Sequence, residues 1–201
     1  RSDNSRHVVQ VSGVAPFTID GFTIRGGNAD LAVDSQASDG GGGIKAVQCH
    51  LAVRDCVIND NQTIRYGGGL RFAELRNGGA SLFNLELTRC RFENNSAQFG
   101  AAAAVGYGVS WSGQGTDGGR DVLKATDCQF LGTSGNGGGG LWLFGSRNSG
   151  AAYRHHLKRC EIAGHSGTGI TVIGFSDPGF LFAPAQIQVD DCAVRSNGAR
   201  G

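Results

Sequence analysis

Five of the six cysteines in this 201-residue chain occupy the same position in a repeated pattern, and this constrains the fold more than any other sequence feature. Apolar residues stand three positions before and two positions after each of them, and an earlier copy of the pattern has Phe22 in place of cysteine. From Phe22 onward, the copies are separated by 34, 34, 38, 32 and 32 residues. Regular spacing in this range indicates stacked structural repeats. The cysteines of this column are Cys56, Cys90, Cys128, Cys160 and Cys192.

Each copy of the pattern has the periodicity of short β-strands. Apolar and polar residues alternate on both sides of the cysteine, and a break in that alternation just before it predicts a bend between two strands. A third strand is predicted where small residues precede an apolar run, at 41–47, 67–72, 100–105, 137–144 and 167–173. These features predict an all-β, right-handed parallel β-helix of about six three-stranded coils, in one domain over residues 1–201.

A second column lies five positions after the cysteine. It holds Asn61, Asn95 and Asn197, with Thr133 and His165 as polar substitutes in the two remaining coils. Stacked asparagines can hydrogen-bond from coil to coil and satisfy backbone groups that a turn leaves unpaired. We therefore predict that this column is a structural ladder.

The cysteine column itself is flanked by apolar residues, which predicts buried thiols. Stacked side chains in a parallel ladder point the same way, a geometry that suits an S–S bond poorly. The cysteines form a line and no Cys-x-x-Cys pair occurs, which argues against a zinc site. Charged residues of alternating sign precede the cysteines and predict a ladder of surface ion pairs, formed by Asp55, Arg89, Asp127, Arg159 and Asp191.

The composition excludes several classes of protein. The 18 basic and 17 acidic residues give a formal net charge of +1, which provides no electrostatic basis for binding nucleic acid. No run of 18 apolar residues exists, so no membrane-spanning helix is predicted. Because the chain contains no methionine, we expect a processed chain or a segment of a longer one.

Two stretches carry a resemblance to a known family. Phe92-Glu93-Asn94-Asn95 precedes the small residues 100–105, and Ile58-Asn59-Asp60-Asn61 precedes Gly67-Gly68-Gly69-Leu70. These stretches resemble the FxxN and GGA-I repeats of polymorphic outer-membrane adhesins, within the right-handed parallel β-helix superfold shared with pectate lyases. The resemblance implies an adhesive or structural module that is secreted or located at the cell surface of a bacterial envelope.

Insertions gather at one edge of the predicted rod. The interval from the glycine-led strand to the following strand grows from 7 residues in one coil to 15, 20, 14 and 17 in the next four. One-sided elaboration of this kind is typical of a binding face on a solenoid. Aromatic, arginine and carboxylate side chains there suit glycan recognition, although the aromatic rings could instead pack the loops onto the rod. The candidate ligand-binding residues are Tyr107, Trp111, Asp117, Arg120, Arg147, Tyr153 and Arg154.

No catalytic or metal site is predicted. Residues 112–120 match only half of a calcium-binding nonapeptide, and the adjacent His155 and His156 point to opposite faces of an extended strand. We expect no cofactor, with calcium as the one alternative left open. The expected partner is a polysaccharide or another surface protein. Two alternatives stay open. One is a polysaccharide lyase or glycoside hydrolase with loop-borne groups such as Asp117 and Asp121. The other is an envelope or fibre subunit that assembles through open solenoid ends.

Overall fold

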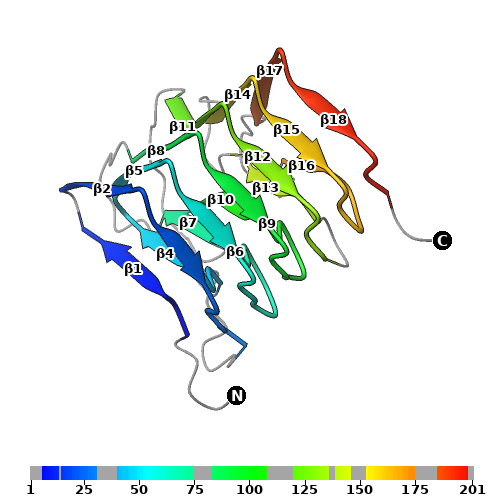
Figure 1. Cartoon of the computed structure of the whole chain (residues 1–201). Helices are drawn as coiled ribbons and strands as arrows, with labels where there is room; N and C mark the ends of the chain where they lie inside the picture. Colours follow the sequence, from blue (N-terminus) through cyan, green and yellow to red (C-terminus); the bar gives the residue numbers. More distant parts are fainter. Residues whose placement is uncertain are drawn as a thin grey trace, which may run out of the picture.

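The computed structural model describes residues 6–13, 15–30, 40–74, 83–107, 120–135, 139–145, 153–174 and 185–198, without the side chains of Glu74, Tyr107 and Arg120. Within these ranges the chain is all-β and forms no helix, and hence no helix that could cross a membrane. The predicted fold class is confirmed. The described residues form a parallel β-solenoid with three sheets (Figure 1).

Each coil contributes one strand to each six-stranded sheet. Sheet A contains β1 (Val9–Ser12), β4 (Ile44–Val47), β7 (Leu70–Glu74), β10 (Ala103–Tyr107), β13 (Leu141–Phe144) and β16 (Ile170–Ile173). Sheet B contains β2 (Pro16–Asp20), β5 (His50–Arg54), β8 (Leu85–Thr88), β11 (Arg120–Thr126), β14 (Tyr153–Lys158) and β17 (Gln186–Asp190). Sheet C contains β3 (Thr23–Arg25), β6 (Val57–Asn59), β9 (Arg91–Glu93), β12 (Gln129–Leu131), β15 (Glu161–Ala163) and β18 (Ala193–Arg195).

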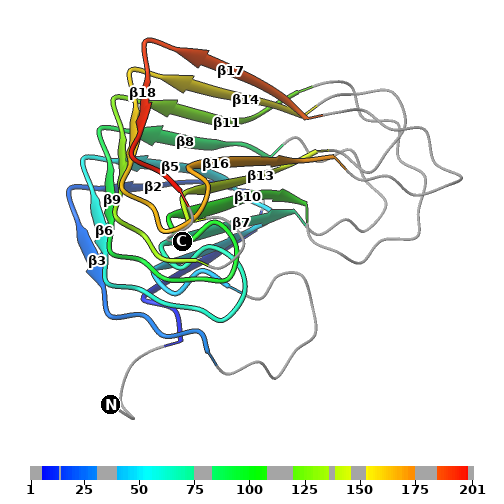
Figure 2. The same cartoon turned by 90° about the vertical axis from the view of Figure 1, so that its right-hand side faces the viewer.

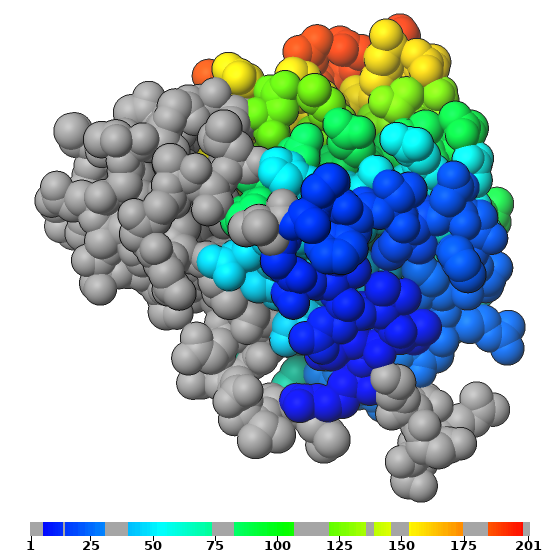
Figure 3. Space-filling model, turned by 90° about the vertical axis from the view of Figure 1, so that its left-hand side faces the viewer, coloured from blue at the N-terminus to red at the C-terminus, as the bar shows by residue number. Residues whose placement is uncertain are grey.

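The coils stack in the register that the repeats predict. Phe92 pairs with Ile58 on one side and with Phe130 on the other, so equivalent residues of successive copies lie directly over one another. Figure 2 separates the three sheets, and in the space-filling view of Figure 3 the colours run from blue to red as the coils follow one another. The chain passes from sheet A to sheet B, then to sheet C, and returns to sheet A one coil further on.

The interior consists of stacked columns of apolar side chains. Phe92 and Phe130 are fully buried and their rings stack at 5.2 Å between centroids, and the leucines that begin β7, β8 and β13 are equally buried. Each coil covers the inward side chains of the next, so burial depends on stacking. The outermost coils lack one neighbour, and there Phe22 is 62% exposed and Val194 is 52% exposed.

The predicted bend between sheets B and C is a single residue in the left-handed conformation. The residue before each column cysteine has a positive φ between 50° and 57°, although none is glycine. This conformation costs an L-residue about 1–2 kcal/mol, and the cysteine that follows supports the bend. For example, the Cys56 thiol donates to the Arg54 carbonyl at 3.0 Å and accepts the Phe22 backbone N–H at 3.4 Å. All six cysteines are free thiols.

The alternating charges of the bend form two ion pairs. The guanidinium of Arg89 contacts both carboxylate oxygens of Asp55, at 2.7 and 2.6 Å, and that of Arg159 contacts both oxygens of Asp127, at 2.6 and 2.7 Å. Hydrogen bonding to the arginine lowers the pKa of each of these aspartates. Both pairs face solvent, where such interactions contribute little to stability. They oppose a shift by one coil, which would place like charges together.

The polar column five residues after the cysteine forms the predicted ladder, here named the amide ladder (Asn61, Asn95, Thr133, His165 and Asn197). Asn61 Oδ1 accepts the Gly27 N–H at 3.0 Å, and its Nδ2 donates to the Ile24 carbonyl at 3.0 Å. Asn95 Oδ1 in turn accepts the Asn61 N–H at 3.1 Å, and Asn95 Nδ2 donates to the Ile58 carbonyl at 2.8 Å. Each asparagine thus satisfies a donor and an acceptor of the preceding coil.

Histidine maintains the ladder at the third link. His165 Nδ1 accepts the Thr133 backbone N–H at 3.3 Å and lies 2.8 Å from Thr133 Oγ1. Nδ1 therefore acts as an acceptor, which places the proton on Nε2. That nitrogen is buried and has no partner among the described residues. Burial lowers the pKa of His165 to about 4, so the neutral imidazole is the stable form in the ladder.

Candidate functional site

The four insertions predicted at one edge all join sheet A to sheet B, between β7 and β8, β10 and β11, β13 and β14, and β16 and β17. Three candidate residues, Trp111, Asp117 and Arg147, lie outside the described residues. Tyr107 ends β10 and Arg120 begins β11. The glycan-binding prediction for these five positions therefore stays a prediction.

Tyr153 and Arg154 stand side by side at the start of β14 but face different environments. Tyr153 is 2% exposed and belongs to the core, whereas Arg154 is exposed on the outer face of sheet B. The strand alternation continues through the next two residues. His155 points inward and is fully buried, and its Nε2 lies 3.0 Å from the Phe144 carbonyl, while His156 points outward. The prediction that these two histidines face opposite sides is confirmed.

A β-bulge shapes the outer face of sheet B at this place. Asp121 pairs with Arg154, but the next pair joins Leu123 with His155, so β11 contains one residue more than β14. Bulges bend a strand and change the direction of a side chain. The side chain of Asp121 therefore lies close to residues from two positions of β14.

The group around this carboxylate is here named the Asp121 cluster (Asp121, Lys124, Arg154 and His156). Asp121 Oδ1 accepts from Arg154 Nε at 2.8 Å and lies 3.0 Å from His156 Nε2, and Asp121 Oδ2 is 3.5 Å from Lys124 Nζ. The hydrogen bond from Arg154, with a further contribution from His156, lowers the pKa of Asp121 to about 2. The carboxylate is therefore ionised at any physiological pH and holds the cationic groups in place.

The cluster remains open to solvent. The side chains of Lys124, Arg154, His156 and Asp121 are 52%, 45%, 32% and 32% exposed. Lysine and arginine outnumber the single carboxylate, which leaves the cluster cationic. In register on the same face, Lys124 is flanked by Glu86 and His156 by Gln188. The row is therefore polar across four strands, with its positive charge concentrated on β11 and β14.

The outer face of sheet A holds an aromatic cluster that the sequence analysis missed. Tyr66 stacks on Phe99 at 5.3 Å, and Phe99 lies 4.7 Å from Trp142. The Arg71 guanidinium is fully buried and lies 5.4 Å from the Tyr66 ring, with Nη1 donating to the Phe72 carbonyl at 3.0 Å. Burial lowers the pKa of Arg71 to about 10. The rings mainly cover this arginine and each other, which is a packing role.

Within the described ranges, no group of three or more histidine, cysteine, aspartate or glutamate side chains could hold a metal ion. Comparison with known proteins adds no assignment, since no protein-family model, no curated protein and no solved structure matches the chain. Sequence reasoning named Arg154 but not its partners as a group. The adjacent histidines were a usable signal, because strand alternation exposes one of them, but the extra residue in β11 had no signature in the sequence.

Proposed function

We propose that this protein is a β-helical binding module, secreted or located at the cell surface, that recognises acidic glycans through the Asp121 cluster. The observation that carries the proposal is the bulge in β11, because it gathers Lys124, Arg154 and His156 around one carboxylate on an otherwise regular sheet face. The cluster lies where two of the four insertions, including the longest, rejoin sheet B. The resemblance of the repeats to outer-membrane adhesins supports the same class of function.

The chemistry of the cluster favours a carboxylate ligand. Asp121 accepts from Arg154 Nε at 2.8 Å and lies 3.5 Å from Lys124 Nζ, so a guanidinium and an ammonium group stand beside one carboxylate on the outer face of the sheet. Hydrogen bonds from such cations to a carboxylate are about twice as strong as neutral ones. Because Asp121 already orients the arginine, less side-chain freedom is lost when the ligand binds. The side chains of the Asp121 cluster stand on β11 and β14, two paired strands of the solenoid, which hold them at fixed positions.

Affinity electrophoresis through gels that contain polygalacturonate tests this proposal. We expect the polymer to retard the wild-type protein, more weakly as salt is added because the contacts are electrostatic. The double variant Lys124→Ala/Arg154→Ala should lose roughly tenfold or more in apparent affinity. Arg91→Ala is the matched control, since Arg91 is an exposed arginine paired with Glu93 on sheet C. Equal losses in both variants, or no retardation of the wild type, would contradict the proposal.

A second candidate function rests on one contact of the same cluster. The 3.0 Å approach of His156 Nε2 to Asp121 Oδ1 is the geometry in which a carboxylate orients a histidine that acts as general acid or base. This favours a lyase or hydrolase acting on the bound glycan as the alternative. Incubation with polygalacturonate distinguishes the two, because an enzyme releases unsaturated or reducing sugar ends. Such release, abolished by His156→Ala, would replace the binding module with the enzyme.

A further inference from the structure

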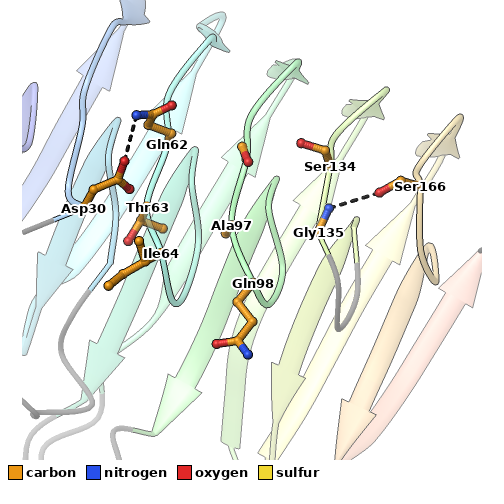
Figure 4. A pocket seen from close by; sticks show the side chains of 10 residues that line it. Asp30, Gln62, Thr63, Ile64, Ala97, Gln98, Ser134, Gly135 and Ser166 are labelled. Carbon is orange, nitrogen blue, oxygen red and sulfur yellow. Dashed lines mark hydrogen bonds between the residues drawn. The ribbon is translucent and has the colours of Figure 1, made fainter. Parts of the chain in front are cut away.

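A groove runs along a different turn of the coil from the insertions. It lies where the chain passes from sheet C back to sheet A. It encloses about 440 Å³, within the usual size range of ligand sites. Residues of successive coils line it, and Figure 4 shows their side chains along the rod. The polar members of this groove, here named the polar groove, are Asp30, Gln62, Thr63, Ser96, Gln98, Ser134 and Ser166.

The walls of the polar groove are held rigidly. Gln62, Ser96 and Ser134 form parallel bridges with one another, each directly after a residue of the amide ladder. Their backbone N–H groups donate to the preceding coil at 2.9, 2.9 and 3.0 Å, and that of Ser166 does so at 3.2 Å. The network that stacks the coils therefore fixes the backbone position of one polar residue per coil along the groove. Because the backbone of this row is already ordered, little conformational entropy is lost there when a ligand binds.

The lining suits a neutral ligand. Its polar groups are mostly hydroxyls and amides, and no lysine or arginine is among the lining residues that the structure describes. The single carboxylate, Asp30, accepts from Gln62 Nε2 at 2.8 Å (Figure 4). The buried side chains of Thr63 and Ala97 and the 48% exposed Ile64 add apolar surface beside these groups. Hydroxyl and amide partners next to apolar patches match a sugar, which has hydroxyl edges and an apolar ring face.

The spacing of the row selects among neutral polymers. Its polar groups repeat once per coil, at about 4.8 Å, the separation of neighbouring strands. An extended peptide along the groove would present successive residues every ~3.4 Å and equivalent side chains every ~6.8 Å, and neither period matches. In an extended, β-1,4-linked polysaccharide each pyranose advances by about one coil spacing. We propose that the polar groove binds a linear neutral polysaccharide lengthwise, with one sugar residue per coil.

The test uses hydroxyethyl cellulose in affinity gels. We expect it to retard the wild-type protein, and Ser134→Phe, which places a ring in the middle of the groove, to reduce the apparent affinity roughly tenfold. Thr18→Phe is the matched control, because Thr18 is exposed on β2, outside the groove. It should stay within about twofold of the wild type. Thermal unfolding of each variant confirms that both remain folded.

Two results would overturn this inference: no retardation of the wild type, or equal retardation of the wild type and Ser134→Phe. The inference does not depend on the Asp121 cluster, which lies on sheet B. The Lys124→Ala/Arg154→Ala variant should therefore bind hydroxyethyl cellulose normally, and Ser134→Phe should bind polygalacturonate normally. Loss of binding to both polymers in either variant would contradict the assignment of separate sites.

Discussion

Gly69 packs directly against the side chain of Asn95. A Cβ placed on Gly69 would lie 3.0 Å from Asn95 Nδ2 and 2.6 Å from the Ala102 carbonyl oxygen. The same relationship joins Gly43 with Asn61 and Gly169 with Asn197. The amide ladder and the glycines that open the strands of sheet A are therefore one packing unit, in which each large polar side chain lies against a residue without a side chain.

Substituting Gly69 tests this relationship directly. We expect Gly69→Ala to lower the free energy of unfolding by about 1–3 kcal/mol, the usual cost of overpacking a well-filled interior. Gly174→Ala is the control, since no atom of the described residues lies within 4 Å of a Cβ at that position. Urea denaturation measures both. If Gly69→Ala left the stability unchanged, both Asn95 and the Ala102 carbonyl would have to move at no cost in free energy, which would contradict tight packing at this position.

In one coil the residue that opens the strand of sheet A is alanine instead of glycine, and this suggests a double-mutant experiment. Ala103 pairs with Leu70 and Leu141, so Ala102 stands where the neighbouring coils have Gly69 and Gly140. The ladder residue at the corresponding coil is Thr133, which is smaller than asparagine. We expect Thr133→Asn alone to destabilise the protein and Ala102→Gly to relieve part of that loss, with a coupling energy of about 0.5–3 kcal/mol. Additive effects of the two substitutions would refute the proposed compensation.

Two buried histidines predict how stability changes with pH. Burial lowers the pKa of both His155 and His165 from 6.5 to about 4. Between pH 6.5 and 4 the unfolded chain therefore binds more protons than the folded one, so stability falls as the pH decreases through this window. Above pH 6.5 this contribution is complete. His165→Asn should reduce the slope in urea titrations repeated across this pH range. An unchanged slope would contradict the prediction.

Replacing the column cysteines by alanine should lower stability, and by more in the buried coils than in the exposed last coil. Cys128 Sγ donates to the Thr126 carbonyl at 3.3 Å and accepts the Cys90 N–H at 3.5 Å. Cys128→Ala leaves that buried N–H without its acceptor, which costs about 1–3 kcal/mol. Cys192→Ala, in the more exposed last coil, should cost less because water can replace the lost contacts. Equal denaturation midpoints for the two variants would argue against a supporting role of sulfur at the bend.

The repeat spacing, the strand alternation, the buried thiols and the amide ladder were all predictable from the sequence. In a parallel solenoid each residue contacts its equivalents one period away, so a column in the aligned repeats is also a column in space. This is why Asn61 and Asn95 could be assigned as partners, and why His155 and His156 could be assigned to opposite faces. The amide ladder and the alternating charges of Asp55 and Arg89 follow from the same rule.

The tertiary structure alone decided where the polar sites form. The Asp121 cluster depends on one extra residue in β11, which shifts the pairing with β14 by a single position and leaves no trace in the repeat pattern. The polar groove depends on how the turns between sheets C and A curve when Gln62, Ser96 and Ser134 stack. A periodic sequence determines which residues lie above one another. How far each turn bends, and thus which surface is hollow or charged, depends on contacts between coils that no single repeat contains.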